Sequence, residues 1–113
     1  STGGIGCEIP GRVSDCPTVA GTYASTKAGV SCTGIGEQIT QQAAAARIVT
    51  RVDDGMPLHE AVAVTMRESN KFNYLYGLIS LNAEGHVEVG KTAALNEVFY
   101  AFHDESRIRT FFV

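Results

Sequence analysis

The chain has 113 residues, of which 44% are hydrophobic and 19% charged, a composition typical of a soluble globular domain with a modest buried core. Its formal net charge of −3 argues against a nucleic-acid-binding protein, which needs a concentrated basic surface. No apolar run approaches the length of a membrane span, so we expect no membrane partner, and an odd number of cysteines, three, favours a reducing compartment such as the cytoplasm.

The first third of the chain is rich in Gly, Ser, Thr and Pro, which is typical of functional loops. Residues 28–33 then predict a short strand that ends at Gly34. Residues 36–53 predict a helix, because apolar residues recur there at intervals of three and four and form one buried stripe: Ile39, Ala43, Ala46, Val49 and Val52. Gly55 is the expected stop signal after this helix.

Pro57 suits the first position of a second helix, which the polar residues 70–73 end. Its expected inner face consists of Leu58, Ala61, Val62, Thr65 and Met66. Beyond it the pattern predicts two strand pairs: 76–82 with 86–90 around a turn at 83–85, and 97–103 with 108–113 around 104–107. The order predicts an α+β fold for a single domain, residues 1–113, with two helices packed on one face of a mainly antiparallel sheet.

Arg12 and Asp15 stand three residues apart in a loop bounded by Gly11 and Pro17. A guanidinium matches a carboxylate in bidentate geometry, and an aspartate accepts from an ammonium. A free amino acid presents both groups on one carbon, so this pair is suited to clamp an amino-acid zwitterion. The alternative is an ion pair between the two side chains at the surface, which contributes little to stability.

The segment Thr33-Gly34-Ile35-Gly36 lies where the predicted strand meets the predicted helix. Its glycines allow a substrate to approach the backbone closely, and N–H groups at a helix start favour negative charge. With the Thr33 hydroxyl, this segment is suited to be an oxyanion hole for acyl transfer, with Gly36 near the bound substrate. The alternative is a strand-to-helix turn that needs small residues. No Lys follows the glycines, which disfavours a phosphate loop.

Thr2, in the opening Ser1–Gly4 segment, is a nucleophile candidate or a hydroxyl that supports one, unless this segment is a frayed terminus. We expect no metal site, because the three histidines lie on separate predicted elements without ligands at metal-binding spacing. Cys16 acting with a distant histidine would resemble a thiol hydrolase, but nothing local supports it, and small buried cysteines are common. The aromatic clusters of the last forty residues are more typical of a core than of a stacking platform.

Four motifs in order make the pattern specific: Ser1–Gly4, Pro10–Pro17, Gly21–Ala24 and Ser31–Glu37. Together they resemble the β-subunit of the plant-type asparaginase/isoaspartyl peptidase family, which are threonine N-terminal nucleophile hydrolases related to glycosylasparaginase. The motifs cover roughly the first third of the chain, and the remainder is similar in pattern only.

The resemblance implies an αββα sandwich assembled from two chains after self-cleavage, and hydrolysis of the asparagine side-chain amide or of β-aspartyl peptides without a cofactor. Arg12 matches the arginine that holds the substrate α-carboxylate, and Asp15 the aspartate that holds the α-amine. Thr33 and Gly34 match the oxyanion-hole pair, and Thr2 matches the second threonine that contacts the nucleophile. The implied partners are an α-subunit from the same precursor and a second αβ unit in a homodimer.

The chain departs from the family pattern at several points. The nucleophilic threonine of the family precedes the segment matched by Ser1–Gly4, so we expect this chain to be part of the β-subunit of a longer two-chain hydrolase. Ser14 replaces a glycine that is usual in the motif, and Cys16 replaces a serine. Glycosylasparaginase activity and a degenerate relative that binds an amino acid without cleaving it stay open as alternatives.

Overall fold

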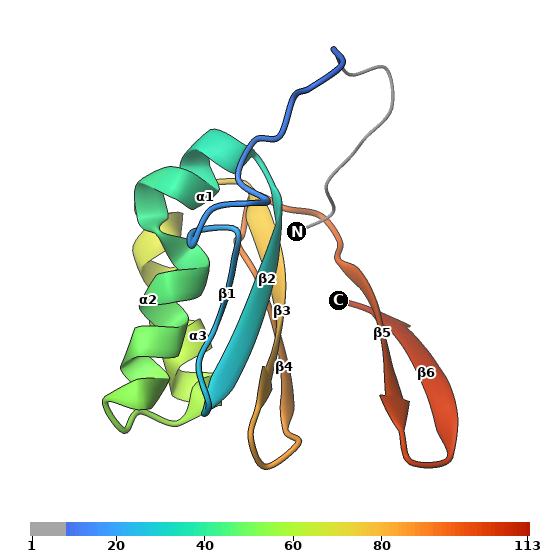
Figure 1. The fold of residues 1–113 in the computed structure, drawn as a ribbon. Coiled ribbons are helices and arrows are strands. Elements are labelled where there is room, and N and C mark those ends of the chain that lie inside the picture. Colours follow the sequence, from blue (N-terminus) through green and yellow to red (C-terminus); the bar gives the residue numbers. More distant parts are fainter. Residues whose placement is uncertain (1–8) are drawn as a thin grey trace.

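The computed structural model of the chain describes residues 9–113, so Thr2 lies outside the described residues. The elements, drawn in Figure 1, follow in this order: β1 (Thr22–Ala24), β2 (Ala28–Gly34), α1 (Gly36–Gln42), α2 (Ala44–Asp53), α3 (Leu58–Asn70), β3 (Tyr76–Asn82), β4 (Val87–Lys91), β5 (Phe99–Asp104) and β6 (Arg107–Phe112).

Strands β1 to β4 form one antiparallel sheet in the order β1-β2-β3-β4, and the helices cover one face of it (Figure 1). α2 packs on β1 and β2, while α3 packs on α2 and β4. The expected α+β architecture, with helices packed on one face of an antiparallel sheet, is therefore confirmed.

The core lies between the helices and the sheet because apolar side chains on both surfaces face each other there. Leu58, Ala61, Val62, Thr65 and Met66 of α3 are all buried, which confirms the inner face expected from the sequence. Alternate residues of the central strands face the same core, including Val30, Cys32, Tyr76 and Leu78. Burying apolar area in this way is the main favourable contribution to folding.

The helix expected over residues 36–53 is wrong as a single element, because Ala43 interrupts it. Ala43 has φ 50° and ψ 43°, the left-handed conformation, and so ends α1 and precedes α2. The first turn of α2 finds its acceptors outside the helix: Ala45 and Ala46 donate their N–H groups to the carbonyls of Ala20 and Val19, at 2.9 and 3.0 Å. These bonds satisfy N–H groups that a helix start leaves without intrahelical partners.

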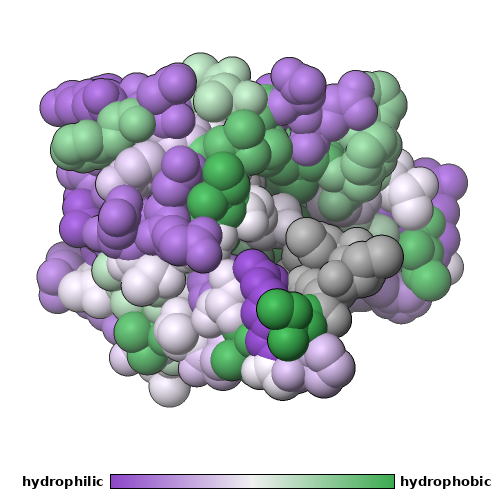
Figure 2. All heavy atoms as spheres, turned by 90° about the horizontal axis from the view of Figure 1, so that it is seen from above, coloured by the Kyte–Doolittle hydropathy of each residue, from purple (hydrophilic) through white to green (hydrophobic). Residues whose placement is uncertain are grey.

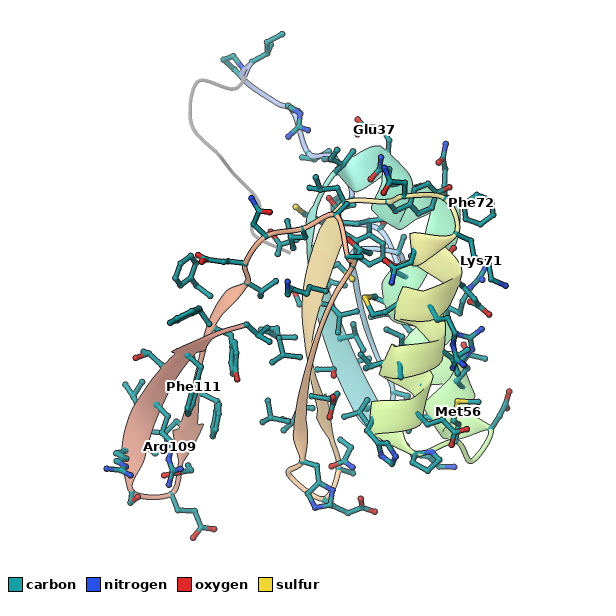
Figure 3. All side chains as sticks on the ribbon, turned by 180° about the vertical axis from the view of Figure 1, so that it is seen from behind. Glu37, Met56, Lys71, Phe72, Arg109 and Phe111 are labelled. Atoms are coloured by element: carbon teal, nitrogen blue, oxygen red, sulfur yellow. The ribbon has the colours of Figure 1, made fainter. Side chains whose placement is uncertain are left out.

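The expected strand pairs both form, the first as β3 with β4 and the second as β5 with β6. The second pair is a separate two-stranded sheet beside the main one (Figure 1). Figure 3 shows its aromatic side chains, among them Phe111, which stacks with Tyr100 and Phe102 at centroid distances of 5.3 and 5.6 Å. β1 is an additional short strand that the sequence did not predict.

The face of the sheet opposite the helices is open. Ile79 and Leu81 of β3 point to this face and are 41% and 50% exposed, although their neighbours Leu78 and Ser80 are buried against the helices. A cleft of about 1100 Å³ separates this face from the β5–β6 hairpin. Among residues 9–113, no helix is both long and apolar enough to cross a membrane.

Candidate active site at the end of β2

A tight turn holds Asp15 close to the end of β2. Thr18 closes this turn by donating its N–H and its hydroxyl to the carbonyl oxygen of Asp15, at 2.9 and 2.7 Å. Gly21 and Thr22 in turn donate their N–H groups to the carbonyl of Thr18. The chain then enters β1, so the Asp15 turn is fixed to the edge of the sheet.

The side chain of Asp15 is buried between two glycines. A Cβ added at Gly21 would lie 2.5 Å from Asp15 Oδ2, and one added at Gly36 would lie 2.9 Å from Asp15 Oδ1. Asp15 is only 4% exposed, and its Oδ2 atom has no hydrogen-bond partner. A buried carboxylate oxygen without a partner is costly. Asp15 is therefore not a solvated surface group, and its environment suits a carboxylate that awaits a donor.

Ser14 has a backbone conformation that favours glycine. Its φ is 39°, in the left-handed region that glycine adopts without a steric penalty. Its hydroxyl lies so near Gly36 that a Cβ there would overlap Ser14 Oγ. Ser14 therefore places a hydroxyl directly against the start of α1, next to the Asp15 carboxylate.

Thr33 and Gly34 end β2 on the same side of the molecule. The register pairs Thr33 with Gly77 and Ser31 with Ile79, so the Thr33 side chain lies on the open face of the sheet. Gly34 has φ 136° and lies against β3, where an added Cβ would be 2.5 Å from Tyr76 Cα. Only glycine fits both the backbone conformation and this close approach. The strand-to-helix turn thus does need a small residue at Gly34, as the structural alternative expected.

α1 begins directly after this turn, with Ile35 as its N-cap and exposed Glu37 in its first turn (Figure 3). Because α1 spans only Gly36–Gln42, its dipole is smaller than that of the single helix expected from the sequence. Seen from above, this end of the molecule carries hydrophobic and hydrophilic residues side by side (Figure 2). Its exposed apolar residues include Ile9, Val13 and Ile35.

The structure brings some of the predicted site residues together. Asp15 and Gly36 lie together, and Ser14 and Gly21, which the sequence did not single out as site residues, lie against them. Thr33 and Gly34 end β2 just before Gly36, and Gly34 lies against Leu75 and Tyr76 rather than against Asp15. Arg12 is exposed in the preceding turn, where its N–H donates to the carbonyl of Ile9 at 3.1 Å. None of these predicted residues lines the cleft beside the hairpin. No cluster of three or more metal-ligating side chains occurs within residues 9–113.

Cys32 is buried in the core next to the candidate site, and its thiol is unreactive. It is 1% exposed, and burial, with a contribution from the Asp15 charge, raises the pKa of its thiol to about 12. A thiol with so high a pKa stays protonated near neutral pH and is a poor nucleophile.

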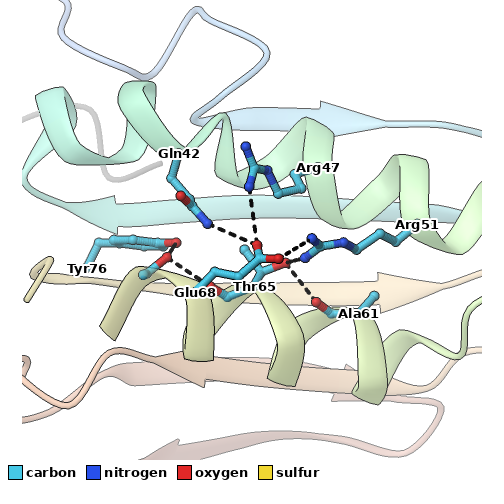
Figure 4. A network of polar contacts seen from close by, with 8 residues as sticks. Gln42, Arg47, Arg51, Ala61, Thr65, Glu68 and Tyr76 are labelled. Atoms are coloured by element: carbon cyan, nitrogen blue, oxygen red, sulfur yellow. Dashed lines mark hydrogen bonds and ion pairs between the residues drawn. The ribbon is translucent and has the colours of Figure 1, made fainter. Parts of the chain in front are cut away.

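A polar network ties the three helices together away from the site (Figure 4). Glu68 of α3 forms ion pairs with Arg47 and Arg51 of α2, at 3.2 and 2.8 Å, and accepts a hydrogen bond from Gln42 of α1. Partial burial opposes ionisation of Glu68, but the hydrogen bonds from Arg51 and Arg47 outweigh it and lower its pKa. The network connects α1, α2 and α3, the helices that pack on the sheet containing β2.

Comparison with known proteins identifies the family of the chain. The whole chain, residues 1–113, matches the asparaginase family. It is 44% identical to the isoaspartyl peptidase/L-asparaginase of Synechocystis, over 96% of this chain and 32% of that protein. It is 34% identical to the plant-type L-asparaginase of Pyrococcus furiosus, over 93% of this chain and 35% of that protein.

A third relative is the isoaspartyl peptidase of Escherichia coli, which is 42% identical over 77% of this chain and 28% of that protein. The chain therefore belongs to the asparaginase family. It spans about a third of the length of the curated relatives that it matches.

Proposed function

We propose that the protein to which this chain belongs hydrolyses the side-chain amide of L-asparagine, the β-aspartyl bond of isoaspartyl peptides, or both. The observation that carries this proposal is the buried Asp15 carboxylate, whose Oδ2 has no partner and which lies against Gly36 beside the Thr33–Gly34 turn. The names of the relatives, isoaspartyl peptidase and L-asparaginase, support the same substrate class.

In the proposed mechanism, a threonine from sequence upstream of this chain attacks the side-chain carbonyl carbon, and its own α-amine takes the hydroxyl proton. The Thr33 hydroxyl and the Gly34 N–H stabilise the negative oxygen of the tetrahedral intermediate. The amide nitrogen leaves as ammonia or as an amine after it receives the proton, and water then hydrolyses the threonyl ester. Arg12 holds the substrate α-carboxylate and Asp15 its ammonium, which aligns the carbonyl. Thr2 supports the nucleophile through its hydroxyl.

The proposal includes a partner chain. This chain is proposed to be part of a β-subunit that packs against an α-subunit from the same precursor, with two αβ units in a dimer. The open face of the sheet supports such packing, since Ile79 and Leu81 are apolar and exposed there. A cytoplasmic location is proposed with it, and the buried free thiol of Cys32 is compatible with a reducing compartment.

The experiment uses the full-length precursor. Intact mass should reveal two chains with a new N-terminal threonine, and release of aspartate from asparagine and from a β-aspartyl dipeptide should follow. Arg12→Lys should raise KM for asparagine strongly and change kcat less, because a point charge does not reproduce the bidentate fork. Arg67→Lys, an exposed substitution on α3, is the matched control and should leave KM unchanged.

Two other outcomes would replace the proposal. Cleavage only of a sugar-linked asparagine would assign glycosylasparaginase activity, for which the names of the relatives give no support. A precursor that stays uncleaved and binds aspartate without hydrolysing any of these substrates would assign a non-catalytic binding protein.

A further inference from the structure

The start of β3 lies in close contact with the proposed oxyanion-hole turn at Thr33–Gly34. Gly34 pairs with Tyr76, and the N–H of Ile35 donates to the carbonyl of Leu75 at 3.0 Å. The close approach at Gly34, 2.5 Å from an added Cβ to Tyr76 Cα, means that any shift of the Leu75–Tyr76 backbone moves Gly34 with it. The position of this turn therefore depends on what holds residues 75 and 76.

Gln38 closes a ring around the turn. Its side-chain Oε1 accepts the N–H of Leu75 at 2.6 Å, and its own N–H donates to the carbonyl of Ile35 at 3.1 Å. Ile35 in turn donates to Leu75, so the start of α1 and the start of β3 are linked in both directions. The part-buried N–H of Leu75 would have no protein acceptor without the Gln38 side chain.

Tyr76 anchors the other side of the ring. Its hydroxyl lies 2.6 Å from Ser69 Oγ (Figure 4), and Ser69 donates its single hydroxyl hydrogen to the carbonyl of Thr65 at 2.9 Å. Tyr76 is therefore the donor to Ser69. Thr92 holds the backbone of the same residue, because its Oγ1 lies 3.2 Å from both the N–H nitrogen and the carbonyl oxygen of Tyr76.

We propose that Gln38 and Tyr76 are positioning residues that fix the Thr33–Gly34 donor pair at the place where the oxyanion forms. This inference rests on the proposed function, because it takes Thr33 and Gly34 as the oxyanion-hole donors; Gln38 and Tyr76 themselves make no contact with the substrate. Burial raises the pKa of Tyr76 to about 12, so its hydroxyl stays neutral at working pH and acts through a hydrogen bond and not a charge. A displaced donor weakens transition-state binding more than substrate binding, because the negative oxygen exists only in the intermediate.

The test compares two identical substitutions on α1 of the full-length, self-cleaved enzyme. Gln38→Met removes the acceptor of the Leu75 N–H, whereas Gln41→Met removes the acceptor of the Tyr74 hydroxyl, a bond of 2.9 Å at the surface. Because loss of one oxyanion-hole donor reduces kcat about 100- to 1,000-fold, we expect a displaced donor to reduce kcat about 10-fold in Gln38→Met, with KM within twofold of wild type. Gln41→Met should keep the wild-type kcat.

Tyr76→Phe is a second, volume-conserving variant and should lower kcat in the same way, again without raising KM. Activity is expressed per cleaved molecule, counted by intact mass, so that slower self-cleavage does not count as slower turnover. The inference is overturned if Gln38→Met and Tyr76→Phe lower only the melting temperature, or if Gln41→Met loses as much kcat as Gln38→Met. An inactive wild-type enzyme would instead refute the proposed function, and this inference with it.

Discussion

Replacing Gly36 by alanine tests the packing of the candidate site most directly. The new Cβ would overlap Ser14 Oγ and lie 3.1 Å from Ser14 Cβ and 2.9 Å from Asp15 Oδ1. Such overpacking costs about 1–3 kcal/mol of folding free energy. Because the Asp15 carboxylate must move, and a misplacement of about 1 Å costs up to about 100-fold in rate, kcat/KM for asparagine should fall by about 10- to 100-fold.

The assay measures urea unfolding and steady-state kinetics of the full-length enzyme. Gly29→Ala is the matched control, since a Cβ there meets only Ala24 Cβ at an ordinary 3.6 Å. The double variant Gly36→Ala with Ser14→Gly removes the overlapping hydroxyl and should recover most of the lost stability. If the double variant is no more stable than Gly36→Ala alone, or if Gly29→Ala is equally damaging, the assigned contact between Ser14 and Gly36 is refuted.

Two further predictions concern the scaffold. Ala43→Gly should raise the free energy of unfolding by up to about 1 kcal/mol. Glycine removes the steric strain that alanine has in the left-handed conformation of the folded state, and this gain exceeds the cost of the greater conformational entropy that glycine gives the unfolded chain. Ala46→Gly, inside α2, should instead lower it by about 1 kcal/mol; equal effects of the two changes would contradict the assigned conformation. Glu68→Gln should lose about 1 kcal/mol or less at pH 7, since the side chain is one-third exposed. Because the folded pKa of Glu68 lies below its ordinary value of 4.5, this difference should shrink as pH falls below about 4.5; a constant difference in urea unfolding would refute it.

The elements with strong local patterns could be predicted from the sequence. α3 has one continuous apolar face that begins at Leu58, and the β3–β4 hairpin has a turn at Gly85 whose φ of 87° favours glycine. The break at Ala43 could not be predicted, because alanine is the best helix former and the apolar period continues through it. Its cause is tertiary: Val19 and Ala20 supply the acceptors for the start of α2. β1 escaped prediction because it has three exposed residues and no alternation.

Only part of the candidate site could be predicted from the sequence, because its remaining contacts are tertiary. Motif spacing indicated Asp15, Thr33, Gly34 and Gly36, because the residue types themselves suggested their chemistry. The contact of Ser14 with Gly36 joins residues far apart in the chain, and the burial of Asp15 against Gly21 depends on how the intervening turn folds back. The contact made by Gln38 gave no sequence signal, since a glutamine in the first turn of a helix is ordinary until its side-chain Oε1 is seen to accept the N–H of Leu75.

The interruption at Ala43 has a mechanical consequence. In a single continuous helix over residues 36–53, the packing of Ile48 and Val49 in the core would also fix the direction of the helix N-terminus. Because the helix is broken at Ala43, α2 packs against the sheet while the short α1 has its own axis, with Gly36 at its start lying against Asp15. A shift of α2 in the interior is therefore not carried along one continuous helix axis to Gly36 and Asp15.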